Sequence, residues 1–139
     1  MTDTDTPRWE LRFEHFNSAL GNLDDAIGEL QARRLSILEQ AGVVQLFEIT
    51  WELGWKLMRD YLAELGVSDN ASSAVGAIRA AFAAEIIDDG DEWMAAAKVR
   101  NTLSHEYHPE RAAEALTLIA ERYLALFKSL ADKIAHETK

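Results

Sequence analysis

Residues 44–65 read VQLFEITWELGWKLMRDYLAEL, a stretch in which apolar residues recur every three or four positions. This period is typical of an amphipathic α-helix that buries one face. The helix is predicted to begin near Ser36 and to stop at Gly66, because glycine commonly terminates helices. Its buried stripe is predicted to contain Val44, Phe47, Trp51, Met58, Tyr61 and Leu65, broadened by Trp55 and Leu62.

The same spacing continues on both sides of this stretch and predicts four more helices, at about 9–33, 73–85, 91–103 and 109–135. No segment shows the sustained alternation of a β-strand. The residues expected to face the core are Phe13, Phe16, Leu20, Leu23, Ile27 and Leu30 in the first helix, Val75, Ile78 and Phe82 in the third, Trp93 in the fourth, and Leu116, Ile119, Tyr123, Leu126 or Phe127, Leu130 and Ile134 in the last.

Three long and two short helices with short connections predict an all-α fold, an antiparallel, up-and-down helical bundle. A chain of 139 residues suits one domain. We expect residues 9–135 to form that single bundle, with a flexible N-terminal arm at 1–8 and a C-terminal tail at 136–139.

The composition excludes several classes of protein. With no cysteine, the chain has no disulfide scaffold, thiolate zinc site, iron–sulfur cluster or cysteine nucleophile. No apolar run approaches the roughly 20 residues that span a bilayer. Residues 1–7 are polar and acidic, unlike a secretory signal. A cytoplasmic protein without membrane contact is expected.

The net charge of −10 argues against broad, non-specific binding of nucleic acid, because phosphate neutralisation supplies most of that affinity. A local cationic cleft in an acidic body stays compatible with this charge.

Metal sites are not indicated. Bundles that hold two metals use Glu-x-x-His pairs, and no glutamate here has a histidine three residues after it. The acidic residues of 88–92 lack the spacing of a calcium loop, and carboxylates are favoured before a helix in any case. We expect no cofactor, and we expect His15 and His136 to be solvated.

The segment 100–107, RNTLSHEY, concentrates groups that can act on a phosphodiester. Arg100 offers a fixed fork of donors to a phosphate, and His105 titrates near neutrality and can move a proton. Together they can promote attack of an RNA 2′-hydroxyl on its own phosphate without a metal. On an uninterrupted helix the two residues lie about 140° apart. A shared site therefore requires that the helix end or kink between them, or that another subunit complete the site.

This segment matches the Arg-x4-6-His motif of HEPN-domain proteins and more closely resembles the Arg-x4-His-x-Tyr motif of HepT toxins. HepT toxins are also described as nucleotidyltransferase substrate-binding proteins. Residues 46–62 resemble the second helix of that family, and residues 80–93 resemble its short helix that leads into a tryptophan. The similarity spans most of residues 11–127.

The resemblance implies a HEPN-like homodimer in which both motifs face one cleft. Arg100 would stabilise the phosphate, His105 would act as general base or acid, and Asn101 would orient either group. A cognate minimal nucleotidyltransferase, the antitoxin of the pair, would transfer AMP from ATP to Tyr107 and so block the cleft. The implied function is a metal-independent endoribonuclease toxin with RNA as substrate.

Two other interpretations stay open. The chain can be a non-catalytic substrate-binding subunit of a two-component nucleotidyltransferase, which the acidity and Glu106 favour. It can also be a structural helical dimer in which the motif only caps a helix. If RNA is the substrate, the cationic cleft would be built from Arg100 and its dimer mate, with Lys98 or Arg79 as additional cations.

Overall fold

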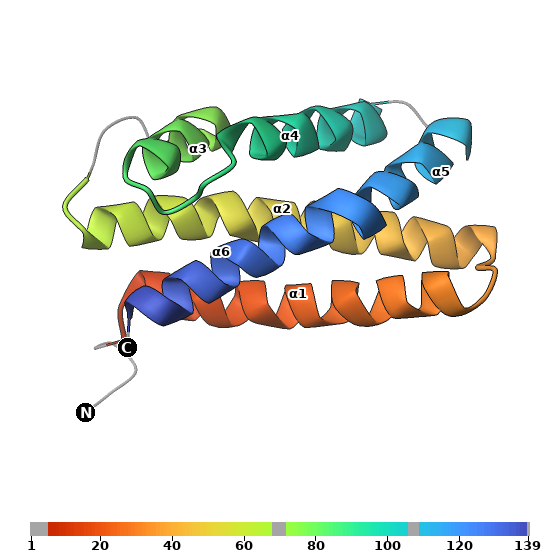
Figure 1. Cartoon of the computed structure of the whole chain (residues 1–139), viewed down its shortest axis with the longest axis horizontal. Coiled ribbons are helices and arrows are strands. Elements are labelled where there is room, and N and C mark those ends of the chain that lie inside the picture. The colour runs from red at the N-terminus through yellow and green to blue at the C-terminus, as the bar shows by residue number, and fades with distance from the viewer. Residues whose placement is uncertain (1–5, 68–71, 106–108, 139) are drawn as a thin grey trace.

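The computed structural model describes residues 6–67, 72–105 and 109–138, and within these ranges every element is a helix (Figure 1). The elements are α1 (Arg8–Ala32), α2 (Ile37–Glu64), α3 (Ala74–Ala83), α4 (Gly90–His105), α5 (Pro109–Leu118), the π-helical segment η2 (Ile119–Tyr123) and α6 (Leu124–Glu137). Since α5, η2 and α6 follow one another without a gap, they form one long helix. The predicted all-α bundle of three long and two short helices is confirmed.

Helix α2 is the centre of the bundle. Figure 1 shows α1 running antiparallel beside it, α3 and α4 following one another along its other side, and the α5–α6 helix crossing the face of the α1–α2 pair. Helix α2 packs against every other helix of the described part of the chain. Its apolar stripe therefore packs against several neighbouring helices.

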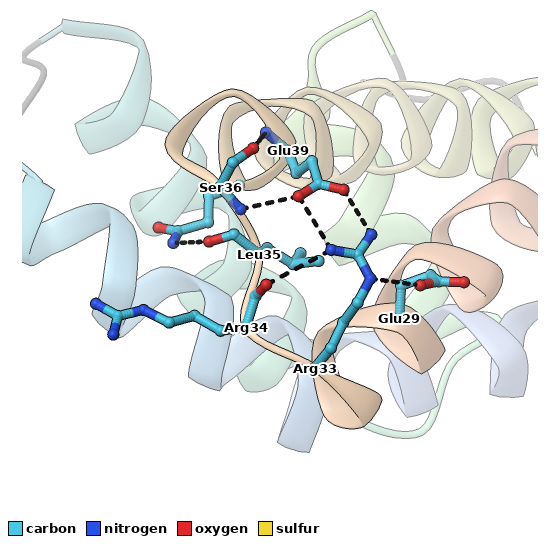
Figure 2. Close-up of polar contacts among 7 residues, drawn as sticks. Glu29, Arg33, Arg34, Leu35, Ser36 and Glu39 are labelled. Atoms are coloured by element: carbon cyan, nitrogen blue, oxygen red, sulfur yellow. Dashed lines mark hydrogen bonds and ion pairs between the residues drawn. The ribbon is translucent and has the colours of Figure 1, made fainter.

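The turn between α1 and α2 is fixed by a polar cluster (Figure 2). Ser36 and Glu39 form a reciprocal capping box, in which the Glu39 N–H donates to Ser36 Oγ and the Ser36 N–H donates to Glu39 Oε1. Arg33 donates through Nε to Glu29 and through both terminal nitrogens to Glu39. One guanidinium thus connects the end of α1 to the start of α2.

The core is rich in aromatic side chains, and the expected burial of Trp51, Trp55 and Trp93 is confirmed. Most of the predicted seam of α1 and the whole predicted seam of the last helix are buried as well. Trp93 lies against Gly54, where an added Cβ would come within 2.9 Å of the indole. Glycine at position 54 therefore lets α4 approach the α2 backbone closely.

Three residues predicted to face inward are exposed instead: Leu65, Val75 and Phe82. Helix α3 turns its alanine face to the core, with Ala77 and Ala81 fully buried, because small side chains allow this short helix to lie close to its neighbours. Phe82 then lies over Gly90 and keeps about half of its surface exposed. Leu65 follows the last helical residue of α2, where the stripe has no neighbour to cover it.

The last helix buries both alternatives of its predicted seam. The wider turn at residues 119–123 shifts the helical register by about one residue. Leu126 and Phe127 follow it in the regular helix α6, about 100° apart, and both are buried because α6 packs against α1 as well as α2. The helix ends at Glu137, two residues beyond its predicted end.

In the part of the chain that the structure describes, no helix is long and apolar enough to cross a membrane.

Replacing Gly54 by alanine is expected to lower the free energy of unfolding by about 1–3 kcal/mol, because the new methyl group collides with Trp93. Gly42 is exposed on the same helix, and a Cβ added there would have no neighbouring side chain within 4 Å. Gly42→Ala should therefore raise the free energy of unfolding by about 0.5–1 kcal/mol. Urea unfolding followed by circular dichroism measures both. Equal effects of the two substitutions would contradict the close approach at Gly54.

The ion pair at the α1–α2 turn predicts a pH dependence of stability. Hydrogen bonds from Arg33, followed by those from Ser36, lower the pKa of Glu39 from 4.5 to about 2. A depressed carboxyl pKa stabilises the fold above pH 4.5, and this contribution disappears as the pH falls towards 2. The stability difference between the parent and Glu39→Gln should follow that window.

Unfolding curves at a series of pH values measure this difference, and Arg33→Gln, which removes the same pair from the other side, should show the same window. A difference that stays constant down to pH 2 would refute the assignment.

Candidate active site

Helix α4 carries the predicted site and is anchored by its own first half. The Asp89 carboxylate accepts from the backbone N–H of Glu92 at the helix start. Trp93 and Ala96 are buried, and Arg100 continues the same face at helical spacing. Anchoring of Trp93 therefore directs Arg100 towards α2.

Arg100 is held against α2 by one anion and one aromatic ring. Its Nη2 lies 3.7 Å from Glu52 Oε2, and its guanidinium lies 5.5 Å from the ring centroid of Trp51, within the range of a cation–π interaction. About a third of the side chain is exposed. The guanidinium is thus restrained on one side and accessible on the other.

Two buried donors at this point have no acceptor among the described residues: Arg100 Nε and Trp51 Nε1. A buried N–H group without an acceptor is costly, and such a group in a native fold calls for an explanation. Both donors suit an anionic oxygen, since neither can accept a hydrogen bond.

Helix α4 continues two residues past its predicted end near Leu103. It stays helical through His105, and the Ser104 hydroxyl donates to the Arg100 carbonyl oxygen, so a break between Arg100 and His105, the first of the two routes to a shared site, is not found. Five residues of regular helix separate positions 100 and 105 by about 140° around the axis. Of the two routes to a shared site, this geometry favours completion by a second subunit.

Of the other predicted site residues, only Asn101 has a side chain within the described part of the chain. Asn101 lies next to Arg100 on α4 and is exposed. The side chain of His105 and the whole of Tyr107 lie outside the described residues. No cluster of three or more potential metal ligands occurs within the described ranges.

The two cations proposed to extend the cleft lie elsewhere. Lys98 is about 200° around α4 from Arg100 and lines a groove between α4 and α5 together with Arg111. Arg79 lines a hollow beside Asp88 and Asp91 where α3 leads into α4. Neither position extends the surface around Arg100.

Sequence reasoning missed the residues of α2 that adjoin Arg100. Glu52 contacts both Arg100 and, at 3.4 Å, Lys56. The spacing of Glu52 and Lys56 indicates an ion pair within the helix, but nothing in it indicates that α4 would bring a third charge to the pair. Trp51 was expected in the core and is there, with one face turned to the guanidinium.

An all-helical bundle that carries Arg-x4-His-x-Tyr from the end of its fourth helix has the features of the HEPN class. Residues 11–136 match the family described as "Nucleotidyltransferase substrate binding protein like", and the chain belongs to this family. The family prediction made from the motif is confirmed.

A curated relative is "Probable ribonuclease HepT" of Haemophilus influenzae, which is 33% identical to the chain over 75 residues. That alignment covers 52% of this chain and 51% of the relative, so the chain spans about half of the relative's length in this match.

Proposed function

We propose that the protein is a metal-independent endoribonuclease and the toxin of a toxin–antitoxin pair. The observation that carries the proposal is the part-exposed Arg100 guanidinium, which Trp51 and Glu52 restrain and whose buried Nε has no acceptor among the described residues. A phosphodiester supplies the anionic oxygens that a guanidinium binds. The name of the Haemophilus relative supports the same activity.

In the proposed reaction the RNA cleaves itself. His105 as general base takes the proton of the 2′-hydroxyl, the O2′–P bond forms, and the P–O5′ bond breaks. An imidazolium returns a proton to the leaving 5′-oxygen. Arg100 stabilises the charge that develops on the non-bridging oxygens, and Asn101 orients the phosphate or the imidazole. The products are a 2′,3′-cyclic phosphate and a 5′-hydroxyl.

The proposal includes a homodimer, because the helical separation of positions 100 and 105 favours a site built from Arg100 of one copy and His105 of the other. It also includes a cytoplasmic location and a cognate minimal nucleotidyltransferase as antitoxin. AMP on Tyr107 would place a fixed anion two residues from His105 and compete with RNA phosphate for Arg100.

A second candidate function is a non-catalytic substrate-binding subunit of a two-component nucleotidyltransferase. The family description favours it, and so does Glu52, which already offsets part of the charge of Arg100. A stable complex with the transferase that cuts no RNA, whether or not Tyr107 is modified, would support this function.

Purified, unmodified protein is expected to cut single-stranded RNA in EDTA, and Arg100→Ala or His105→Ala should each lower the rate by at least about a hundredfold. If each site combines the two residues in trans, the two variants mixed under subunit exchange should recover about a quarter of parental activity, because half of the dimers regain one of two sites.

Gel analysis of a labelled RNA measures both effects. If the mixed variants exchange subunits but recover no activity, each site takes both residues from one chain. Cleavage by both single variants at the parental rate would refute the nuclease function.

Co-expression with the proposed cognate minimal nucleotidyltransferase is expected to add AMP to the protein at Tyr107. Intact-mass and peptide mass spectrometry detect the adduct, and Tyr107→Phe should carry none and should escape inhibition. AMP found on Tyr61 or Tyr123 instead would contradict the assignment; burial raises the pKa of both phenols, consistent with poor access.

A further inference from the structure

A row of basic side chains continues from Arg100 along α2 to α1. The members of this cation row are Arg12, Lys56, Arg59 and Arg100. Among the described ion pairs they contact two acidic residues, Glu52 and Asp60, so these pairs contain four cations and two anions. The whole chain has a net charge of −10, which makes this excess positive charge notable.

One end of the row is built on a buried carboxylate. The Asp60 side chain is only 4% exposed, and its two oxygens each lie 3.0 Å from a guanidinium Nε, one of Arg12 and one of Arg59. A single cation is enough to neutralise a buried carboxylate. The second arginine therefore adds a positive charge beyond the one that Asp60 neutralises, and this charge stays accessible to another anion.

The bonding of both arginines leaves donors for such an anion. Arg12 and Arg59 each donate to Asp60 through Nε, and no hydrogen bond of their terminal amino groups occurs within the described part of the chain. Both side chains stay about a quarter exposed. Terminal guanidinium nitrogens form the fork that binds a phosphate with two parallel bonds.

The middle of the row is restrained by an aromatic ring. Lys56 Nζ and the Arg59 guanidinium lie 5.9 and 5.4 Å from the ring centroid of Trp55. Positions 52, 56 and 60 follow one another at four-residue steps of about 6 Å along the helix axis, so Glu52 and Asp60, which pair with the two ends of the row, lie about 12 Å apart along α2. The cations thus occupy a line rather than a single point.

We propose that the cation row binds the backbone phosphates of single-stranded RNA next to the phosphate held by Arg100. This inference rests on the proposed function and names the path of its substrate. A line of fixed cations suits a phosphate backbone, and contacts of this kind carry no base specificity. The row accounts for how a protein of net charge −10 engages RNA at all: it concentrates its positive charge where the strand must lie.

The test uses a labelled single-stranded RNA with 2′-O-methyl groups, which cannot cleave itself, and fluorescence anisotropy over a range of salt concentrations. The double variant Lys56→Gln/Arg59→Gln is compared with Lys128→Gln/Lys133→Gln on α6, which loses the same charge and also one ion pair for each lysine. We expect about tenfold weaker binding for Lys56→Gln/Arg59→Gln but not for Lys128→Gln/Lys133→Gln. For the first variant, the negative slope of log affinity against log salt should decrease in magnitude by about 1.4.

Lys56→Gln alone keeps both arginines on Asp60 and should decrease the magnitude of the salt slope by about 0.7, so the test holds even if the double variant fails to fold. Equal loss of RNA affinity in both double variants would attribute the effect to net charge and would contradict RNA binding by the cation row. Parental affinity in Lys56→Gln/Arg59→Gln, or no RNA binding by the parent, would contradict it as well.

Failure of the nuclease function reads out separately. If the protein binds RNA through the cation row but does not cut it, the RNA-binding proposal stands and the nuclease proposal fails. If it cuts RNA although substitution of Lys56 and Arg59 does not affect binding, the nuclease proposal stands and the RNA-binding proposal fails.

Discussion

The contact between Trp93 and the backbone at Gly54 sets the position of α4. Because position 54 has no side chain, the indole reaches the surface of α2 and packs against Phe127, which in turn packs against Phe16. Seven residues further along α4, about two turns, Arg100 arrives beside Trp51 and Glu52 of the same helix. Without that close approach the guanidinium would lack both its aromatic platform and its counter-ion.

The distribution of charges in the structure changes what the acidity of the chain implies about a nucleic-acid partner. Net charge alone argues against a nucleic-acid partner. The structure gathers four cations on one line across α1, α2 and α4 and opposes them with two carboxylates, of which Asp60 is buried and Glu52 is part-exposed. Under the proposed function, repulsion over the remaining surface would restrict RNA to this line, which predicts weak general affinity and a narrow range of substrates.

Apolar spacing was enough to predict the helices, because burial of one face has to repeat with the period of the helix. It failed where packing between helices decides the outcome. Helix α3 buries alanines in place of Phe82 because close approach outweighs side-chain size there, and the π-helical turn before Leu124 depends on how both halves of the last helix meet the core.

Motif reading found Arg100 and His105 as chemical groups, yet a single helix offers no information about what α2 brings to them. Glu52 comes beside Arg100 only through the tertiary packing of α4 against α2, which the sequence of either helix alone does not reveal.

Identification of RNA termini tests the central claim most directly. Cleavage in EDTA should leave a 2′,3′-cyclic phosphate on the upstream fragment and a 5′-hydroxyl on the downstream one. Fragments ending in a 3′-hydroxyl and a 5′-phosphate, or intact RNA, would contradict it.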